Sequence, residues 1–595
     1  NPFPPPQPDD AMKYLLPLAL ALLALLTGCA ATTPAQPHAD ALDGWTLEQK
    51  VGQILMIADT EVAPEQARDL HLGAILISPN GSHREGVETL NDWRSFYARY
   101  QTDNPAFDPT NPSRLPVLLA IDAVHGNALV PGATVFPHNL ALAAADRPDL
   151  THQAGRITAR ETAAIGANWA LAPTLAITRD HRWGRTYEGW GSTPDHARNH
   201  ARAFITGVQN EKPAGHPVLA CAKHFVGDGE PTWGTGRDGG IDRGDVRLTR
   251  DQLRKIHVPP FQEAIDAGVA SIMVNYGSFN GTRAHHHPWL LQNLLRDELG
   301  FQGVVVSDFN GFALDRPLAE GALNSLNSGV DLLMVGKNWR DVRTRLLEAA
   351  RTGELHLSRL DQAVTRVLEM KKRATPAPDA APRARLDDTF ASRRAYQVAH
   401  ELVASSIVEL SDPENLLPLK NPRRILVLGP KADNLAVQAG GWTLGWGGFS
   451  DPHDPRFHGR TILDGLQNGA DKTGAELAYH PQGAPDPGMK TGYDVCIVVI
   501  GEQPYAEWFG DNPQPSLSEE DQLLLQQADA LDLPTVAVLL TGRPLHLGDW
   551  LTRIDAWAVA WLPGSAADAV AAPLLGQHPF TGHLPLPWPT PTQPD

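Results

Sequence analysis

Short apolar runs alternate with amphipathic stretches along most of the chain. Seven apolar, β-branched runs predict strands at residues 73–78, 116–122, 169–177, 218–225, 271–276, 304–308 and 331–335. Helical patterns lie between them, at 149–167, 193–208, 249–267 and 289–298. Repetition of strand and helix over this length favours a parallel sheet closed as a TIM-like (β/α)8 barrel. Only seven strands can be placed, and an open doubly wound sheet has the same periodicity.

A second alternating region follows the first. A Pro- and Ala-rich stretch at 374–384 indicates an interdomain linker, and a helix is expected at 393–408. Five further strands are expected at 425–429, 477–480, 495–501, 535–541 and 556–562, with a helix at 518–530. The predicted fold class is therefore α/β. It has a barrel over 46–373, a linker over 374–392 and a smaller α/β sandwich over 393–595.

The amino end has the pattern of an export signal. Met12 and Lys13 precede an apolar run at 15–26, which is too short to span a bilayer comfortably. The following Leu26-Thr27-Gly28-Cys29 resembles a bacterial lipobox, in which Cys29 is the lipidated first residue of the mature protein. Ordinary cleavage near Ala30 is the alternative. We expect residues 1–28 to be upstream residues and signal peptide, 29–45 to be a tether, and the mature chain to be a periplasmic or surface lipoprotein of a bacterial cell envelope.

Composition narrows the function classes. With 595 residues the chain is too long for one hydrophobic core, and 42% hydrophobic with 20% charged residues is typical of globular proteins. A net charge of −18 without a basic stripe argues against nucleic acid as a partner. Membrane attachment is expected only through the lipid. Apart from Cys29, Cys221 and Cys496 lie in apolar runs of different domains and are expected to be buried free thiols.

Polar residues gather where the predicted barrel strands end. Asp122 ends the second strand, Lys223 and His224 lie at the end of the fourth, and Asp308 ends the sixth, while Arg185 lies in the loop after the third. The carboxyl ends of parallel strands meet at one edge, where ligands bind in α/β folds. Acids and cations together with Trp, Tyr and Phe suit a polyhydroxylated molecule such as a sugar.

The sequence implies no cofactor and no metal in this function. Gly-rich phosphate-binding loops of the GxGxxG or Walker type are missing from the sequence, and Cys-based zinc spacing is not found. The run His285-His286-His287 is the one tempting cluster. Because consecutive residues point in different directions, a solvated loop is the preferred interpretation.

Motifs at the strand ends and in the second domain resemble glycoside hydrolase family 3, in particular its exo-acting β-glucosidases and β-glucan exohydrolases. The barrel motifs are IDAVHG (121–126), GATVFPHN (132–139), RDHRWGRTYE (179–188), AKHFVGDG (222–229), SIMVNYGSFNG (271–281) and VSDFNG (306–311). The second-domain motifs are GGWTLGW (440–446), VVIGEQPYAE (498–507) and GHLPLPWP (582–589). The resemblance covers nearly the whole mature chain in order.

This resemblance implies a retaining exo-β-glucosidase that releases glucose from β-glucans or from cello- and laminari-oligosaccharides by double displacement. Asp308 would be the nucleophile, and Glu502 of the second domain the acid/base, with Glu507 as the alternative. The resemblance also implies a substrate-binding set: Asp122, Arg185, Lys223, His224, Met273, Tyr276, Phe309 and either Trp442 or Trp446. Retention needs two carboxyl groups ~5–5.5 Å apart. Lys223 and neighbouring donors are expected to keep Asp308 ionised, and Asp308 to raise the pKa of the acid.

Two departures from the family pattern leave the substrate open. Phe309 stands where many relatives have Trp, which puts the linkage preference in doubt, and the loop at 230–245 looks longer and more charged than usual. A β-N-acetylhexosaminidase of the same superfamily is one alternative, although its usual KHFPGHG-like motif is altered here at Val226 and Asp228. A non-catalytic glycan-binding lipoprotein is another. The oligomeric state is not predicted.

Overall fold

The computed structural model describes residues 42–80, 86–101, 108, 110, 115–484 and 492–589. The chain divides into two compact units, Asn1–Asp43 and Gly44–Asp595, and the second contains both sheets described below. The expected signal peptide and Cys29 lie outside the described residues and stay predictions. Of the helices in the described ranges, none combines the length and apolarity that crossing a membrane requires.

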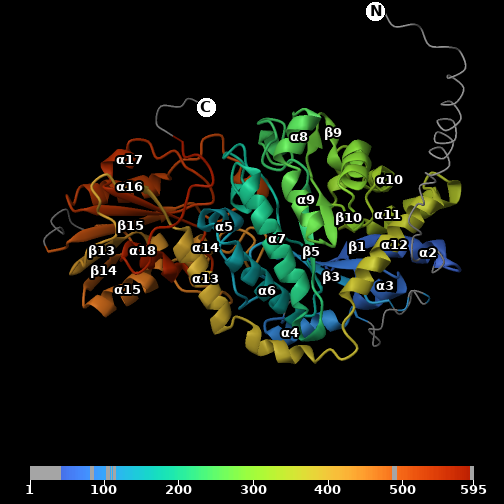
Figure 1. The fold of residues 1–595 in the computed structure, drawn as a ribbon, viewed down its shortest axis with the longest axis horizontal. Helices are drawn as coiled ribbons and strands as arrows, with labels where there is room; N and C mark the ends of the chain where they lie inside the picture. The colour runs from blue at the N-terminus through green and yellow to red at the C-terminus, as the bar shows by residue number, and fades with distance from the viewer. Residues whose placement is uncertain are drawn as a thin grey trace, which may run out of the picture. The chain divides into compact units, whose positions relative to one another are not determined.

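Eight parallel strands form the first sheet, which is closed into a barrel and confirms the predicted fold (Figure 1). In chain order they are β1 (Leu55–Ala58), β2 (Ala74–Ile77), β3 (Leu118–Ile121), β4 (Trp169–Ala170), β5 (Leu219–Phe225), β7 (Ser271–Val274), β10 (Val304–Val306) and β11 (Leu333–Val335). Each pairs with the next, and β1 pairs with β11. A parallel bridge between Val306 and Leu332 joins β10 to β11, with Ser307 N–H donating to the Leu332 carbonyl at 2.9 Å.

Three local differences from the prediction have physical causes. Strand β1 was not placed because its apolar residues directly continue the buried end of helix α2 (Leu47–Gln53), so periodicity does not separate the two elements. Strand β4 is short because Pro173 has no N–H to continue the ladder. The helix predicted at 249–267 is two helices, α8 (Arg250–Ile256) and α9 (Pro259–Asp266), and two prolines open the second.

Helices cover the outside of the barrel, and apolar side chains fill it. The covering helices include α3 (Pro64–Asp69), α4 (Leu90–Ala98), α6 (Pro148–Ala164), α7 (Pro194–Glu211), the π-helix η9 (Trp289–Glu298), α10 (Leu318–Ser328), α11 (Trp339–Thr352) and α12 (Leu357–Ala374). One buried cluster joins Met56, Leu76, Trp169, Cys221 and Val306, contributed by five different strands. Cys221 and Cys496 are buried free thiols, as predicted.

A mixed six-stranded sheet forms the second domain and confirms the predicted α/β class. Its order is β12 (Val408–Ser411), β17 (Ala556–Trp561), β16 (Thr535–Leu540), β15 (Val495–Gly501), β13 (Arg424–Leu428) and β14 (Glu476–His480), with only β12 antiparallel to its neighbour. Helices α13 (Arg393–Ser406), α15 (Ile462–Thr473) and α16 (Glu519–Asp529) pack against it. Strand β12 was not predicted because its first residue was assigned to the preceding helix.

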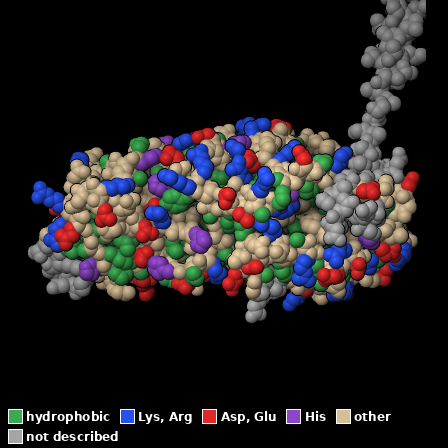
Figure 2. All heavy atoms as spheres, turned by 90° about the horizontal axis from the view of Figure 1, so that it is seen from below, with side chains coloured by type: hydrophobic (Ala, Val, Ile, Leu, Met, Phe, Trp, Pro, Cys, Tyr) green, Lys and Arg blue, Asp and Glu red, His purple; other side chains and the backbone are tan. Residues whose placement is uncertain are grey.

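One apolar cluster is continuous between the two sheets. It contains Leu142 of α5 (Asn139–Ala145), Leu150 and Ile157 of α6, Leu402 of α13, and Val427, Ile497 and Val538 of the second sheet. In Figure 1, α5 and α13 lie between the orange-to-red sheet and the barrel. Burial of this shared surface holds the two domains in a fixed register. On the face shown in Figure 2, acidic and basic side chains are interspersed rather than gathered in one patch.

Candidate active site

A cavity of about 620 Å³ lies at the carboxyl ends of the barrel strands, and the second domain forms part of its wall. The predicted site residues that line it are Asp122, Arg185, Lys223, His224, Met273, Tyr276, Asp308, Phe309, Trp442 and Trp446. Glu507 and Trp508 of the second domain line it as well. Residues from both domains therefore share one chamber of the size that small ligands occupy.

Strand geometry explains why the barrel residues converge. Asp122 directly follows β3, Lys223 and His224 lie near the end of β5, and Asp308 comes two residues after β10. The residue between, Ser307, accepts a hydrogen bond from Met334 N–H at 2.8 Å, which fixes this strand end against β11. The acid is thus delivered to the barrel mouth on a rigid element.

Asp308 has few partners of its own. Its Oδ1 accepts from Phe309 N–H at 2.7 Å, and its Oδ2 lies 3.6 Å from His224 Nε2. Burial raises the pKa of Asp308, while His224 acts to lower it and the nearby Glu507 to raise it. Lys223 Nζ binds Asp122 Oδ1 at 2.5 Å, and the neighbouring donors that act to lower the pKa of Asp308 are His224, Arg185 and Arg243.

His285 supports Asp308 from behind and corrects the prediction of a solvated histidine loop. His285 is fully buried and His286 is 9% exposed. The Asp308 N–H donates to His285 Nε2 at 3.0 Å. Burial lowers the pKa of His285 to about 3, so the ring is neutral and its nitrogen accepts this bond. Sequence reasoning judged the triple-histidine run by its spacing and missed that it lies in a loop after a barrel strand.

Acidic side chains hold three of the polar groups that line the cavity. Lys223 pairs with Asp122, and although burial acts to lower the pKa of Lys223, Asp122 raises it. Arg185 donates to both oxygens of Glu188 at 2.8 Å. His224 Nδ1 lies 2.5 Å from Asp228 Oδ2. These pairs fix donors and acceptors in place before a ligand arrives, which limits the reorganisation that binding requires.

Burial also sets the charge of the His224 pair. It lowers the pKa of His224 to about 3 and raises the pKa of Asp228 to about 6. At neutral pH the imidazole is therefore uncharged and Asp228 is ionised. Nδ1–H then donates to Asp228, and Nε2 faces the cavity beside Asp308.

The two candidate acids of the second domain lie in different surroundings. Glu502 accepts hydrogen bonds from Thr541 Oγ1 at 2.8 Å, Tyr505 OH at 3.0 Å, Gly542 N–H at 3.1 Å and Arg543 Nε at 3.0 Å. It is not among the residues that line the cavity.

Glu507 does line the cavity. Its Oε1 lies 3.5 Å from Arg185 Nη1, and its Oε2 accepts from Arg243. The side chain that shares the chamber with Asp308 is therefore Glu507, the acid that sequence reasoning placed second. The assignment of the acid/base from the sequence stays a prediction.

The loop at 230–245 supplies two cavity residues that sequence reasoning did not name. Arg243 lies over the Tyr276 ring at 3.9 Å and over the Trp508 ring at 4.4 Å, and Arg237 lies over the Trp508 ring at 3.7 Å. The high charge of this loop was the sequence feature that could have identified these two residues. Its length lets it reach the second domain, so it forms a wall between the two domains.

Asp511 ties the Glu507 loop to the barrel. Its Oδ1 accepts from Gly184 N–H, and its Oδ2 accepts from the N–H groups of Ile241 and Asp242, each at 2.8 Å. Gly184 allows this approach, because a Cβ there would meet the Glu507 carbonyl oxygen at 2.1 Å. Glu507 itself has φ +51°, a conformation that costs energy in a residue with a Cβ and that the surrounding contacts must hold.

An aromatic rim surrounds the cavity mouth. Trp446 lies against Trp508 with ring centroids 5.2 Å apart, and Phe309 on the barrel side is 39% exposed. Trp442 is deeper: it is buried and donates from Nε1 to Glu188 at 3.1 Å. The structure thus separates the two tryptophans, with Trp446 at the rim and Trp442 in the inner wall.

This site and fold define the class of protein, and comparisons with known proteins agree. The model "Glycosyl hydrolase family 3 N terminal domain" matches residues 46–370, and "Glycosyl hydrolase family 3 C-terminal domain" matches residues 407–595. The chain belongs to glycosyl hydrolase family 3, and it is a glycoside hydrolase similar to β-glucosidases.

Relatives within the family differ in the substrates that their names give. A lysosomal β-glucosidase of Dictyostelium discoideum is 32% identical over 88% of this chain and 67% of its own length. A β-xylosidase of Formosa agariphila is 30% identical over 79% of this chain and 68% of its own. The structure of a mutant exo-1,3/1,4-β-glucanase (ExoP) from a Pseudoalteromonas species superposes with a TM-score of 0.85 at 34% identity, covering 93% of this chain and 91% of that one.

Proposed function

We propose that the protein is a retaining, exo-acting β-glucosidase that releases glucose from the non-reducing ends of β-glucans or of cello- and laminari-oligosaccharides. The observation that carries this proposal is that Asp308 of the barrel and Glu507 of the second domain line one cavity, beside the ion pairs of Lys223 with Asp122 and of Arg185 with Glu188. Two carboxyl groups facing one sugar are what double displacement requires.

The proposed reaction has two steps. Asp308 attacks the anomeric carbon while Glu507 gives its proton to the glycosidic oxygen, so that the C–O bond breaks and a glycosyl ester forms on Asp308. Glu507, now a carboxylate, takes a proton from water, and that water displaces Asp308 from the same carbon. Arg185 and Arg243, which contact Glu507, hold its carboxyl group in position in both steps.

The cavity favours a terminal sugar unit. Its inner wall is made of buried side chains, among them Arg185, Lys223, His224 and Trp442, so we propose that a chain enters by one end only. Asp122 and Lys223 offer an acceptor and a donor to hydroxyl groups. Trp446 at the rim would stack on the next sugar, opposite Phe309. Two of the relatives named above are a β-glucosidase and an exo-β-glucanase, which supports glucose, whereas the β-xylosidase shows that the family fold also accommodates pentoses.

A panel of aryl β-glycosides tests which sugar the enzyme prefers. We expect kcat/KM for the β-glucoside to exceed the values for the β-xyloside and the N-acetyl-β-glucosaminide by at least about tenfold. The xyloside lacks a group that the site binds, and the added acetamido group of the glucosaminide collides with the site. Proton NMR of the first turnovers should show β-glucose before mutarotation. A faster N-acetylglucosaminide would favour a hexosaminidase, and glycan binding without turnover would favour a binding protein.

Substitution of Asp511 tests whether its contacts with the barrel position the Glu507 loop. Asn at this position keeps the size but replaces one acceptor oxygen by an NH2 group, which opposes the N–H groups now bound there. We expect Asp511→Asn to displace the Glu507 loop and to lower kcat about 100-fold, the effect of a misplacement of about 1 Å. Asp549→Asn, an exposed acid of the same domain, is the matched control. An unchanged kcat for Asp511→Asn would show that this tie does not position Glu507.

A further inference from the structure

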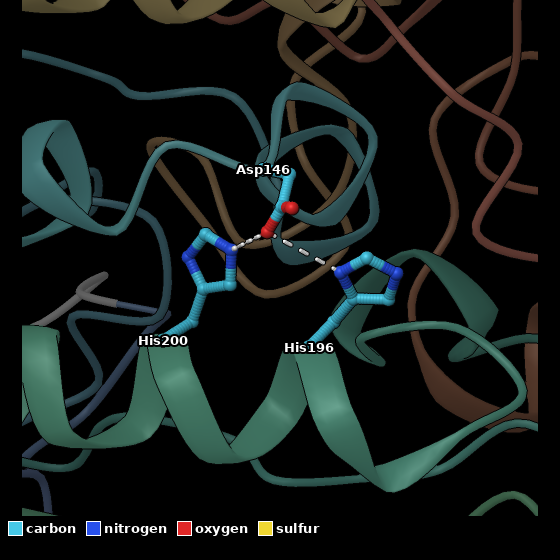
Figure 3. Close-up of side chains that lie close together, drawn as sticks. All are labelled: Asp146, His196 and His200. Carbon is cyan, nitrogen blue, oxygen red and sulfur yellow. Dashed lines mark ion pairs between the residues drawn. The ribbon is translucent and has the colours of Figure 1, made fainter.

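Three metal-ligating side chains meet outside the active-site cavity. Asp146 is the residue at which α5 ends, and His196 and His200 lie four residues apart on α7, on one face of that helix (Figure 3). One ligand atom from each residue lies within 4.8 Å of the other two. Asp146 Oδ1 is 3.5 Å from His196 Nδ1 and 3.7 Å from His200 Nε2. No member of this cluster lines the cavity described above.

These separations suit a bound ion better than direct contacts. Hydrogen bonds between nitrogen and oxygen are usually about 2.9 Å long. Around a tetrahedral Zn²⁺, ligand bonds of about 2.0–2.2 Å place neighbouring ligand atoms roughly 3.4 Å apart. The Asp146 oxygen lies at about this spacing from each ring nitrogen, and the dashed lines in Figure 3 mark these two ion pairs, which meet at that oxygen.

The surroundings of His200 are a second, independent observation in favour of a bound ion. It is fully buried, its ring stacks on Trp190 with centroids 4.8 Å apart, and its Nδ1 lies 2.8 Å from Thr151 Oγ1. Its Nε2 is buried without a hydrogen-bond partner, and it points toward Asp146. Buried polar atoms are rarely left unpaired unless a water or an ion completes them.

The proton on His200 can be assigned from this environment. When Nδ1–H donates to Thr151, the lone pair of Nε2 faces Asp146 and His196. A metal-ligating histidine usually has its other nitrogen held by such a partner.

We propose that Asp146, His196 and His200 bind one divalent transition-metal ion of the Zn²⁺ class. Two imidazole nitrogens and one carboxylate oxygen match the ligands of Zn²⁺ and of similar ions such as Co²⁺ and Ni²⁺, whereas Mg²⁺ and Ca²⁺ prefer oxygen ligands throughout. Asp146 is exposed and His196 is half-buried, so water can fill the remaining position.

Such an ion joins elements that also support the active site. At the start of α5, Asn139 donates to the Glu188 carbonyl at 2.8 Å, and Glu188 holds Arg185. Trp190, which stacks on His200, donates to the Thr174 carbonyl at 2.7 Å. Binding only to the folded chain would raise Tm as the free ion concentration increases.

The test uses the untagged full chain after treatment with a chelator and dialysis. Calorimetric titration with ZnCl2 should show one ion bound per chain at this site, and Co²⁺ should give the visible absorption bands of a low-symmetry site. Asp146→Asn and His196→Ala, both at accessible positions, should each weaken Zn²⁺ binding by at least about 100-fold and remove the Co²⁺ bands.

Two matched controls separate this site from adventitious binding. Asp195→Asn removes the exposed acid beside His196, and His453→Ala removes an exposed histidine that faces a single acid, Asp433, at 3.4 Å. Both should leave the titration unchanged. The proposal is overturned if the chain binds no Zn²⁺, or if Asp146→Asn and His196→Ala bind it as tightly as the unmodified chain.

Discussion

We expect Asp308→Ala to lower kcat/KM for an aryl β-glucoside by roughly 10⁴-fold or more, the range found when a covalent nucleophile is removed. The next carboxylate along the chain, Asp315, does not line the cavity, and hydrogen bonds with Phe309 N–H and His285 Nε2 hold Asp308 in its position. Azide should restore turnover, because the small anion fits the space that the carboxylate leaves. It would attack the anomeric carbon once, so the product should be the α-glucosyl azide.

Two measurements check this assignment. Incubation of the unmodified chain with a 2-deoxy-2-fluoro-glucoside, followed by peptide mass mapping, should place the label on the peptide that carries Asp308. Asp315→Ala is the matched control, since Asp315 lies seven residues further on, pairs with Arg316 and does not line the cavity. A β-configured azide from Asp308→Ala, or a label on another peptide, would contradict the proposed nucleophile.

The sequence was most informative where function depends on local structure. Asp122, Lys223, His224 and Asp308 were predicted together because each lies at the end of an apolar run, and parallel strands bring such ends to one edge. The barrel itself followed from the repeated pattern. Strand β1 was not predicted because only one residue separates it from helix α2. A four-residue apolar run is too short to show a periodicity of its own.

The remaining site residues depend on contacts between distant segments. Arg243 meets Glu507 across 264 positions of sequence, and Asp511 meets Ile241 across 270. Nothing near Glu502 or Glu507 in the sequence shows which of them turns toward the barrel. That choice is made by Asp511 and Gly184, which dock the Glu507 loop, and by Arg543, which engages Glu502. Such docking is a property of the folded pair of domains.

Glu507→Ala and Glu502→Ala should therefore differ in kind. For Glu507→Ala we expect kcat/KM on a disaccharide or a phenyl glucoside to fall by about 10²–10⁴-fold, the usual contribution of a general acid. A 2,4-dinitrophenyl leaving group needs no proton, so the glycosyl ester should form at a nearly normal rate and accumulate as a burst. Azide should then attack the ester from the opposite face and give the β-glucosyl azide.

Glu502→Ala acts through the fold instead. It leaves Arg543 without its charged partner at a site where Arg543 is 3% exposed, and an unpaired buried charge of this kind costs about 3–5 kcal/mol. We expect a lower Tm, similar losses for all leaving groups and no product with azide. Glu502→Gln, which retains an acceptor for Thr541, should recover part of the stability. Removal of the residue that protonates the leaving group is what leaves room for azide beside the glycosyl ester. If Glu502→Ala formed the β-glucosyl azide and Glu507→Ala were fully active, Glu502 would be the acid/base.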